Sequence, residues 1–174
     1  MAYPNKQKLI SATALAAFLA VAPNAANASG YETGMQRLNI EDTSGNRDLE
    51  GFVWYPTEQT ERMVRAHGNQ VWEAITVLPD AEPAAGEFPI VVLSHGMFGN
   101  ARNQAWLAQE LVAEGYVVAA IDHPGTTTFN RDADERRMMW KRPQDMSRVI
   151  DFLTTQWKLS GVLNQDRIFA AGHS

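Results

Sequence analysis

Three short segments of the sequence combine glycine with residues that can act as nucleophiles, bases or hydrogen-bond donors. They are residues 94–99 (SHGMFG), 122–125 (DHPG) and 172–174 (GHS). Each comes directly after an apolar run typical of a strand buried on both faces, at residues 90–93, 116–121 and 167–171. Because ligands bind beyond the carboxyl ends of the strands in an open α/β sheet, we expect the three segments to meet at one crevice.

The last of these segments predicts a nucleophile. Gly172-x-Ser174 after a buried strand is the first part of a sharp strand-to-helix turn that holds a serine hydroxyl exposed above a sheet. The pattern alone is expected about once by chance in a chain of this length. The strand that precedes it gives it weight, and we predict that Ser174 is the catalytic nucleophile.

The segment after the first buried strand predicts the oxyanion loop that such a serine needs. Acyl transfer requires hydrogen-bond donors aimed at the oxygen that becomes negative when a carbonyl is attacked. One donor is the N–H after the nucleophile, and another comes from a loop after an earlier strand. Gly96 and Gly99 allow a tight turn, so we predict that the Met97 backbone N–H is this donor. An ordinary glycine-rich turn is the alternative.

The histidines are expected to have supporting roles. Since the triad of this kind of site runs Ser, then Asp or Glu, then His along the chain, none of those before Ser174 is expected to be the general base. The four are His67, His95, His123 and His173. We expect His95 and His123 to brace loops or line the site and His173 to pack structurally.

The predicted substrate-binding residues are His95, Gly96, Phe98 and His123. Asp122 is expected to fix a loop as a hydrogen-bond acceptor and not to be the triad acid.

Several stretches of the sequence resemble the core motifs of bacterial α/β-hydrolases. They are residues 88–96 (FPIVVLSHG), 115–125 (GYVVAAIDHPG) and 166–174 (DRIFAAGHS). With residues 54–56 (WYP) and 80–81 (DA), they are similar to the group that resembles platelet-activating-factor acetylhydrolases, often labelled predicted dienelactone hydrolases. The resemblance covers most of residues 35–174 and implies Ser174 as nucleophile and Met97 as oxyanion donor.

The resemblance implies an activity on carboxylic esters. True dienelactone hydrolases use a cysteine nucleophile, and this sequence has no cysteine. We therefore expect a serine hydrolase that cleaves lipid-like or small acyl esters through an acyl-enzyme. A peptidase or acyltransferase on the same fold is one alternative, and a non-catalytic binding protein of the same fold is another.

The elements that position these residues predict an α/β fold. Residues 35–42 and 49–55 indicate an antiparallel hairpin, and residues 71–77 alternate as another short strand. The three buried strands follow, joined by crossover helices, which favours parallel pairing. Residues 57–70 are polar, and we expect a loop or a short helix there.

Two helices are predicted between the buried strands. The first begins near Asn103 as a possible N-cap and ends at Gly115. The second has Pro143 in its first turn and an apolar stripe from Met146 to Trp157. We expect Trp106 and Trp157 to lie in the core.

The two ends of the sequence carry separate predictions. Residues 1–28 combine an early positive charge, an apolar stretch at 9–22 and a small-x-small site at 26–28, which indicates a secretory signal peptide and export to the periplasm or medium. A transmembrane anchor is the alternative, but the stretch is shorter than the roughly 20 residues a span needs. We expect residues 29–174 to be the N-terminal portion of one α/β-hydrolase domain, inactive as written because the triad acid and base would follow Ser174.

Composition excludes several partners. The net charge is −5 and no Lys/Arg run is dense enough for a nucleic-acid surface. Basic residues at 131–142 alternate with acidic ones, so we expect a solvated mixed-charge loop. Metal-ligand spacing and nucleotide-binding fingerprints are missing from the sequence, so we expect no metal and no cofactor, and a small-molecule ester as the partner.

Overall fold

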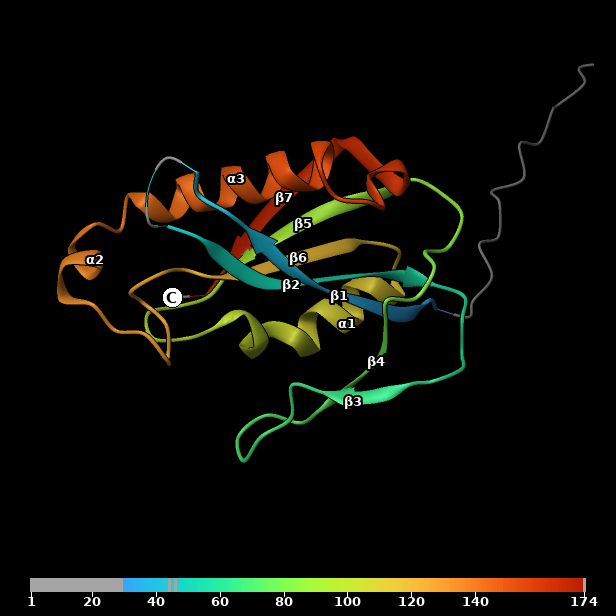
Figure 1. Ribbon diagram of the computed structural model, residues 1–174. Coiled ribbons are helices and arrows are strands. Elements are labelled where there is room, and N and C mark those ends of the chain that lie inside the picture. The colour runs from blue at the N-terminus through green and yellow to red at the C-terminus, as the bar shows by residue number, and fades with distance from the viewer. Residues whose placement is uncertain (1–29, 44, 46, 174) are drawn as a thin grey trace, which may run out of the picture.

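The structure is a computed structural model that describes residues 30–43, 45 and 47–173. The predicted signal peptide and Ser174 lie outside the described residues. A seven-stranded mixed sheet of order β3-β4-β1-β2-β6-β5-β7 runs through the molecule (Figure 1). The strands are β1 (Glu32–Ile40), β2 (Leu49–Thr57), β3 (Val64–Ala66), β4 (Ile75–Pro79), β5 (Phe88–Ser94), β6 (Val117–Asp122) and β7 (Leu163–Gly172).

The strand pairing confirms the predicted fold class. β1 and β2 form an antiparallel hairpin in register from Glu32↔Thr57 to Ile40↔Leu49. β5 pairs in parallel with both β6 and β7, so the three strands share one direction. The predicted burial of the third strand on both faces is wrong, because β7 lies at the edge of the sheet and most of its residues are exposed. The sheet also contains a parallel β1–β4 pairing that the sequence did not predict.

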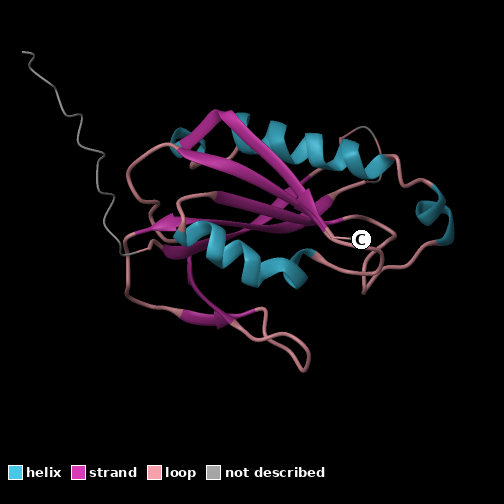
Figure 2. Cartoon of the chain, turned by 180° about the vertical axis from the view of Figure 1, so that it is seen from behind, coloured by secondary structure: helices cyan, strands magenta, loops and turns pink. Residues whose placement is uncertain are grey.

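Helices cover both faces of the sheet (Figures 1 and 2). They are η1 (Ala101–Gln104), α1 (Ala105–Ala113), α2 (Ala133–Arg137), α3 (Lys141–Thr155) and η2 (Ser160–Val162). α3 packs Val149 and Leu153 into a cluster with the buried face of β5 and β6, and Trp157 joins it as predicted. α1 packs on the other face through a separate cluster.

The helix α1 corrects two predictions. Its N-terminal turn is η1, whose cap is Asn100 and not Asn103, because the Asn100 side chain accepts a hydrogen bond from Arg102 N–H at 3.0 Å. Trp106 is 55% exposed and not in the core. The stripe of α1 that faces the sheet consists of small residues, Ala105, Ala108 and Val112, which allow close approach and leave Trp106 pointing elsewhere.

The segment between β2 and β5 is more ordered than the sequence predicted. Residues 57–70 were expected to be a loop or short helix, but they contain β3, which pairs with β4. The strand predicted at 71–77 begins only at Ile75. The Asn69 side chain accepts hydrogen bonds from the N–H groups of Val71 and Trp72 at 2.8 and 3.0 Å, which holds these residues in a turn.

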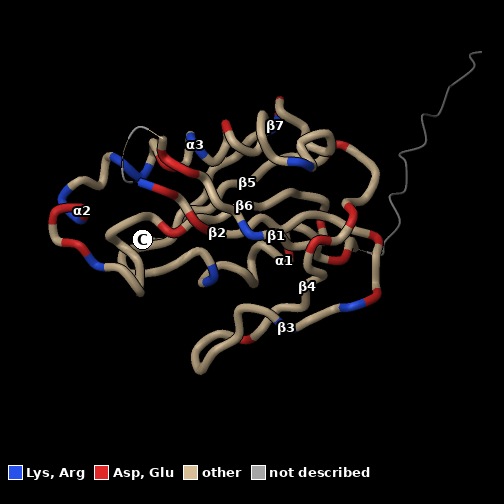
Figure 3. The backbone as a smooth tube through the Cα atoms, viewed as in Figure 1, with Lys and Arg blue, Asp and Glu red and all other residues tan. Residues whose placement is uncertain are grey.

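The basic stretch at 131–142 is also not a simple solvated loop. Asp132 caps α2 by accepting hydrogen bonds from Asp134 N–H and Glu135 N–H, which starts a short helix. Arg142 is only 9% exposed. Figure 3 shows charged residues of both signs around α2, close to the loops that follow the parallel strands.

The described residues contain no helix long and apolar enough to span a membrane.

Candidate active site

The loops after β5, β6 and β7 meet at one edge of the sheet, as the sequence predicted. Phe98 N–H donates to Thr126 O at 2.9 Å, and Thr128 N–H donates to Gly99 O at 2.9 Å. These bonds join the β5 loop to the β6 loop. His173 N–H donates to Ser94 O at 3.1 Å, which brings the end of β7 against the end of β5.

An apolar pocket of about 530 Å³ opens beside these loops. Its wall includes three of the predicted site residues of the β5 loop besides Met97: His95, Gly96 and Phe98. Trp72 and Trp106 supply aromatic surface, and His173 closes the side next to the end of β7. The exposed Trp106 therefore belongs to this pocket.

The turn that contains Met97 has an uncommon backbone conformation and is fixed by neighbouring residues. Among the hydrogen bonds within the described chain, none has the Met97 N–H as donor. The next residue, Phe98, has a φ of 63°, a left-handed conformation that is uncommon for a large side chain. Phe98 N–H and the Phe98 carbonyl are both held by the β6 loop, the carbonyl by Thr128 Oγ1 at 2.7 Å, so the strained turn is fixed in place.

Basic residues of the α2 region pack on the Phe98 ring. The guanidinium of Arg131 lies 4.6 Å from the ring centroid and that of Arg136 lies 5.6 Å from it. Such cation–π contacts restrain the ring. The residues expected to be a solvated loop thus brace one wall of the pocket.

Beneath the loops lies a hydrogen-bonded series with the residue types of a catalytic triad. Ser94 Oγ is 2.9 Å from His123 Nε2, and His123 Nδ1 is 2.9 Å from Asp145 Oδ2. Because the carboxylate must accept, Nδ1 carries the proton and Nε2 accepts from the Ser94 hydroxyl. We call Ser94, His123 and Asp145 the buried triad.

Burial gives the buried triad a structural character. His123 is fully buried and Asp145 is 1% exposed, and neither Ser94 nor His123 lines the apolar pocket. Of the four predicted substrate-binding residues, His123 is thus the one that the structure places away from the pocket. Because His123 cannot touch a ligand in the pocket, it braces the loops, which is one of the two roles expected for it.

Charged residues extend the buried triad toward the surface. Arg47 Nε and Nη2 donate to the two oxygens of Asp145, both at 2.7 Å. Arg47 Nη1 continues to Glu135 at 2.7 Å, and Lys141 reaches the same carboxylate at 3.0 Å. A two-point guanidinium–carboxylate contact is geometrically specific, so it fixes the β1–β2 turn against α3.

His95 links the buried triad to the oxyanion loop. His123 N–H donates to His95 Nε2 at 3.0 Å, so His95 Nδ1 carries the proton and donates to Gly96 O at 2.7 Å. Arg142 Nη2 donates to the His95 carbonyl. The backbone just before Met97 is therefore held from both sides by buried groups.

The electrostatics keep both histidines neutral. Burial lowers the pKa of His95 to about 4, against the opposing hydrogen bond to Gly96 O, and the charge of Arg142 adds to the lowering. Burial also lowers the pKa of His123, against the opposing hydrogen bond that Nδ1 donates to Asp145. For Asp145, burial alone would raise the pKa, but hydrogen bonds from His123 and Arg47 outweigh it and hold the pKa below its ordinary value.

Asp122 occupies the place predicted for it. Its Oδ1 accepts from Ala101 N–H at 2.7 Å, at the first residue of η1. Burial raises the pKa of this carboxyl, with the Ala101 hydrogen bond opposing. It fixes the loop between β5 and α1 and does not contact either ring nitrogen of His123, both of which have other partners.

Sequence reasoning did not find Asp145, Arg47 or Trp72. Arg47 and Asp145 are 98 residues apart, and no local spacing signals such a pair. Within the described residues, no group of three or more histidine and acidic side chains could hold a metal ion.

The fold and the placement of the loops define the class of protein. A mixed sheet with parallel central strands, helices on both faces and reactive loops at the strand ends is the α/β-hydrolase fold. Residues 58–148 match the family described as platelet-activating factor acetylhydrolase, isoform II, and the chain belongs to this family. A comparison with curated protein sequences finds no match.

Solved structures with similar folds include esterases. A ferulic acid esterase from Streptomyces cinnamoneus is 25% identical, with a TM-score of 0.70 over 86% of this chain and 54% of that one. A hypothetical protein from Pseudomonas aeruginosa is 14% identical, with a TM-score of 0.50 over 80% of this chain and 35% of that one. An acetyl xylan esterase from Paenibacillus sp. R4 is 15% identical, with a TM-score of 0.45 over 79% of this chain and 45% of that one. The chain spans about half the length of the first of these proteins.

Proposed function

We propose that the protein is a serine hydrolase of carboxylic esters and that Ser174 is its nucleophile. The observation that carries the proposal is the oxyanion loop. It is a strained turn at an apolar pocket, anchored at both Phe98 N–H and Phe98 O, and its Met97 N–H has no acceptor among the described residues. Ser174 lies outside the described residues, but it follows His173, whose backbone is bonded to the end of β5. The family to which the chain belongs and its similarity to a ferulic acid esterase also support the proposal.

The proposed reaction follows from these positions. The Ser174 hydroxyl attacks the carbonyl carbon of the ester while a general base takes its proton. The Met97 N–H and the N–H after the nucleophile stabilise the oxyanion. Collapse of this intermediate expels the alcohol, which takes up the proton, and water then releases the acid by the reverse sequence. In this fold the acid and the base usually come after the nucleophile along the sequence.

The pocket favours apolar groups on the ester. Its aromatic wall of Trp72, Phe98 and Trp106 and the exposed Met97 side chain offer dispersion contacts and few polar partners. A small acyl or aromatic group fits a volume of about 530 Å³. The same machinery would serve a peptidase or an acyltransferase, so substrate turnover must separate these alternatives.

The buried triad provides a second candidate nucleophile, Ser94. Its distances to His123 and through it to Asp145 match those of an activated serine. The burial of His123 argues against it, because a general base must be within reach of the substrate. The Ser94 hydroxyl is instead expected to anchor β5 to the β6 loop.

A labelling experiment separates these possibilities. The full-length protein, Ser174→Ala and Ser94→Ala are each treated with a fluorophosphonate probe. We expect wild type and Ser94→Ala to be labelled and Ser174→Ala not. Labelling that is lost only in Ser94→Ala would assign the nucleophile to Ser94. No labelling of any variant would favour a non-catalytic binding protein.

Export is part of the proposal. It is supported by the apolar stretch at residues 9–22 and the small-x-small site ending at Ala28. We expect the mature protein to begin at Ser29 and to be found in the periplasm or the medium. Determining the N-terminal sequence of the protein recovered from each fraction checks this, and an intact Met1 in a membrane fraction would instead indicate an anchor.

A further inference from the structure

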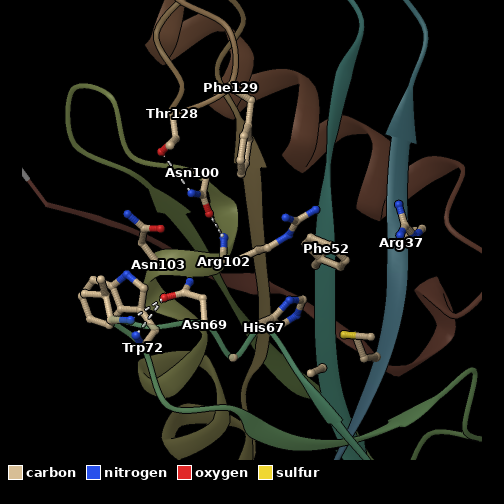
Figure 4. A pocket seen from close by; sticks show the side chains of 14 residues that line it. Arg37, Phe52, His67, Asn69, Trp72, Asn100, Arg102, Asn103, Thr128 and Phe129 are labelled. Carbon is tan, nitrogen blue, oxygen red and sulfur yellow. Dashed lines mark hydrogen bonds between the residues drawn. The ribbon is translucent and has the colours of Figure 1, made fainter.

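A second and larger cleft adjoins the apolar pocket. It has a volume of about 710 Å³ and lies between the β3–β4 loop and the loop that carries Phe129 (Figure 4). Trp72 and Asn103 line both this cleft and the apolar pocket, so the two spaces adjoin at these side chains. The larger cleft is therefore next to the place where the ester of a substrate would lie.

The chemistry of this cleft differs from that of the pocket. Its charged lining residues are Arg37 and Arg102, and the lining includes no aspartate or glutamate. Arg37 lies opposite Phe52 in the β1–β2 register, with its guanidinium 5.8 Å from the ring centroid. The Arg102 guanidinium approaches the same ring to 5.6 Å and Phe129 to 5.7 Å. Two cations are thus gathered around one aromatic ring, as Figure 4 shows.

Neither arginine is neutralised by an ion pair. Among the described residues, no carboxylate lies within 4.0 Å of either guanidinium. Burial raises the pKa of Asp122, and the nearby charge of Arg102 only partly opposes this rise; one Asp122 oxygen accepts from Ala101 N–H at 2.7 Å. Glu50 and Asp122 line a separate depression of about 190 Å³ that also touches both arginines. Within the part of the chain that the structure describes, neither guanidinium group donates a hydrogen bond, so their donors are not taken up by the protein there.

His67 also lines this cleft. Its φ is 65°, and its ring packs edge-on against Phe52 at a centroid distance of 4.5 Å. Burial and, to a lesser extent, the charges of Arg102 and Arg37 together lower the pKa of His67 to about 4. The cleft therefore contains a neutral imidazole whose Nε2 has no partner in the described chain.

We propose that this arginine cleft is a subsite for a negatively charged group of the ester substrate, with Arg37 and Arg102 as its ligands. The substrate class is then an ester that carries a carboxylate several bonds from the scissile carbonyl. Its apolar segment lies against Trp72, and its charged end reaches the guanidinium groups. Guanidinium donors suit such an oxyanion because they can bind both of its oxygens. This inference rests on the ester-hydrolase function proposed above.

Matched esters test the proposal. In one pair, p-nitrophenyl octanoate is compared with the p-nitrophenyl monoester of suberic acid, which has the same acyl length and a terminal carboxylate. In a second pair, phenyl butyrate is compared with 4-carboxyphenyl butyrate, which carries the charge on the alcohol. We expect the full-length protein to prefer the charged ester in at least one pair. Raising the ionic strength should weaken that preference, because these charges are exposed to solvent.

Variants locate the preference. For the double variant Arg37→Gln/Arg102→Gln, the ratio of kcat/KM for the charged ester to that for the neutral ester should fall about tenfold, as expected for the loss of two exposed charge contacts. Arg65→Gln is the control. It removes one positive charge from β3, where Arg65 is exposed and does not line the cleft. It should leave the ratio unchanged.

The failures are distinguishable. If neutral esters are hydrolysed but neither charged ester is preferred, or if Arg65→Gln lowers the ratio as much as the double variant, the arginine cleft is not an anion subsite. If no ester is hydrolysed and Ser174 is not labelled, the proposed function itself is overturned, and this inference with it.

Discussion

The carboxylate of Asp145 accepts hydrogen bonds from a buried histidine and from a two-point arginine contact. Its side chain is 1% exposed, and that of Arg47 is 16% exposed. Taking such a charge out of water is costly, and the partners must compensate for it. The role of a residue in this site thus depends on burial as much as on distance, since Ser94, His123 and Asp145 have triad spacing without access to the pocket.

We predict that Asp145→Asn destabilises the protein by roughly 3 kcal/mol, because it leaves Arg47 without its charge partner and His123 without a full acceptor. Urea unfolding of the full-length protein at pH 7.5 measures this. The ester-hydrolase activity should fall as well, since His123 holds His95 and the backbone before Met97.

Asp134→Asn is the matched control. Asp134 pairs with Arg137 at 3.1 Å, but both side chains are at least 80% exposed. Exposed pairs contribute little, so this variant should unfold at nearly the wild-type urea concentration. Equal midpoints for Asp145→Asn and wild type would show that the buried triad does not stabilise the fold.

At the scale of elements, the sequence predicted those parts of the fold that depend on local pattern. The strands β5 and β6 are buried apolar runs as predicted, and Gly115, with a φ of 83°, follows the end of α1. The position of β7 was predicted but its burial was not, because β7 lies at the edge of the sheet and most of its residues are exposed. β3 was missed because three residues carry too little periodicity and depend on pairing with β4.

The candidate site was predictable to a similar degree. The rule that ligands bind at the carboxyl ends of parallel strands located the loops of His95 and Met97. It could not reveal that the β3–β4 loop brings Trp72 to the same pocket, or that Arg37 and Arg102 gather around Phe52. These are contacts between distant segments, and they depend on packing that no spacing in the sequence encodes.

The β2–β6 pairing leads to a prediction at this scale. Gly51 lies opposite Ile121 in this antiparallel pair, and a Cβ on Gly51 would collide with the Ala120 carbonyl oxygen and lie 2.8 Å from Ile121 Cα. Gly51→Ala must therefore push β2 away from β6, at a cost of about 1–3 kcal/mol or more. Thermal unfolding of the full-length protein measures this loss.

Gly161→Ala provides the comparison. This glycine has no other atoms within 4 Å of its would-be Cβ, so the substitution should leave the unfolding temperature close to that of wild type. If Gly51→Ala is equally tolerated, β2 and β6 do not approach each other as closely as the fold requires.

At the scale of the whole molecule, partly or fully buried histidines lie at two separate places. His67 packs on Phe52 and Trp54 beside the cluster under α1. His95 and His123 lie at the loop end of the sheet, with ring centroids 5.0 Å apart. All three have lowered pKa values. The folded protein therefore keeps these imidazoles neutral under conditions in which the unfolded chain protonates them.

This difference sets the direction of the pH dependence. In the unfolded chain the histidine pKa is near 6.5, whereas the folded values of His67 and His95 are about 4. Between these values the unfolded state binds more protons, so stability is complete above pH 6.5 and is lost as the pH falls toward 4. Each such histidine contributes a slope of at most about 1.4 kcal/mol per pH unit. The lowered pKa of Asp145 adds a loss only at still lower pH.

Urea midpoints of the full-length protein between pH 7.5 and pH 4.5 measure this effect. We predict a midpoint that is constant above pH 7 and falls steadily below pH 6.5. His67→Asn should reduce the slope, because it removes one of the titrating groups while asparagine tolerates the left-handed φ of 65° at this position. Ser160→Asn, on the distant η2, should keep the wild-type slope. A midpoint that stays constant down to pH 5 would contradict the prediction, because it would require the histidines to be as easily protonated in the folded protein as in the unfolded chain.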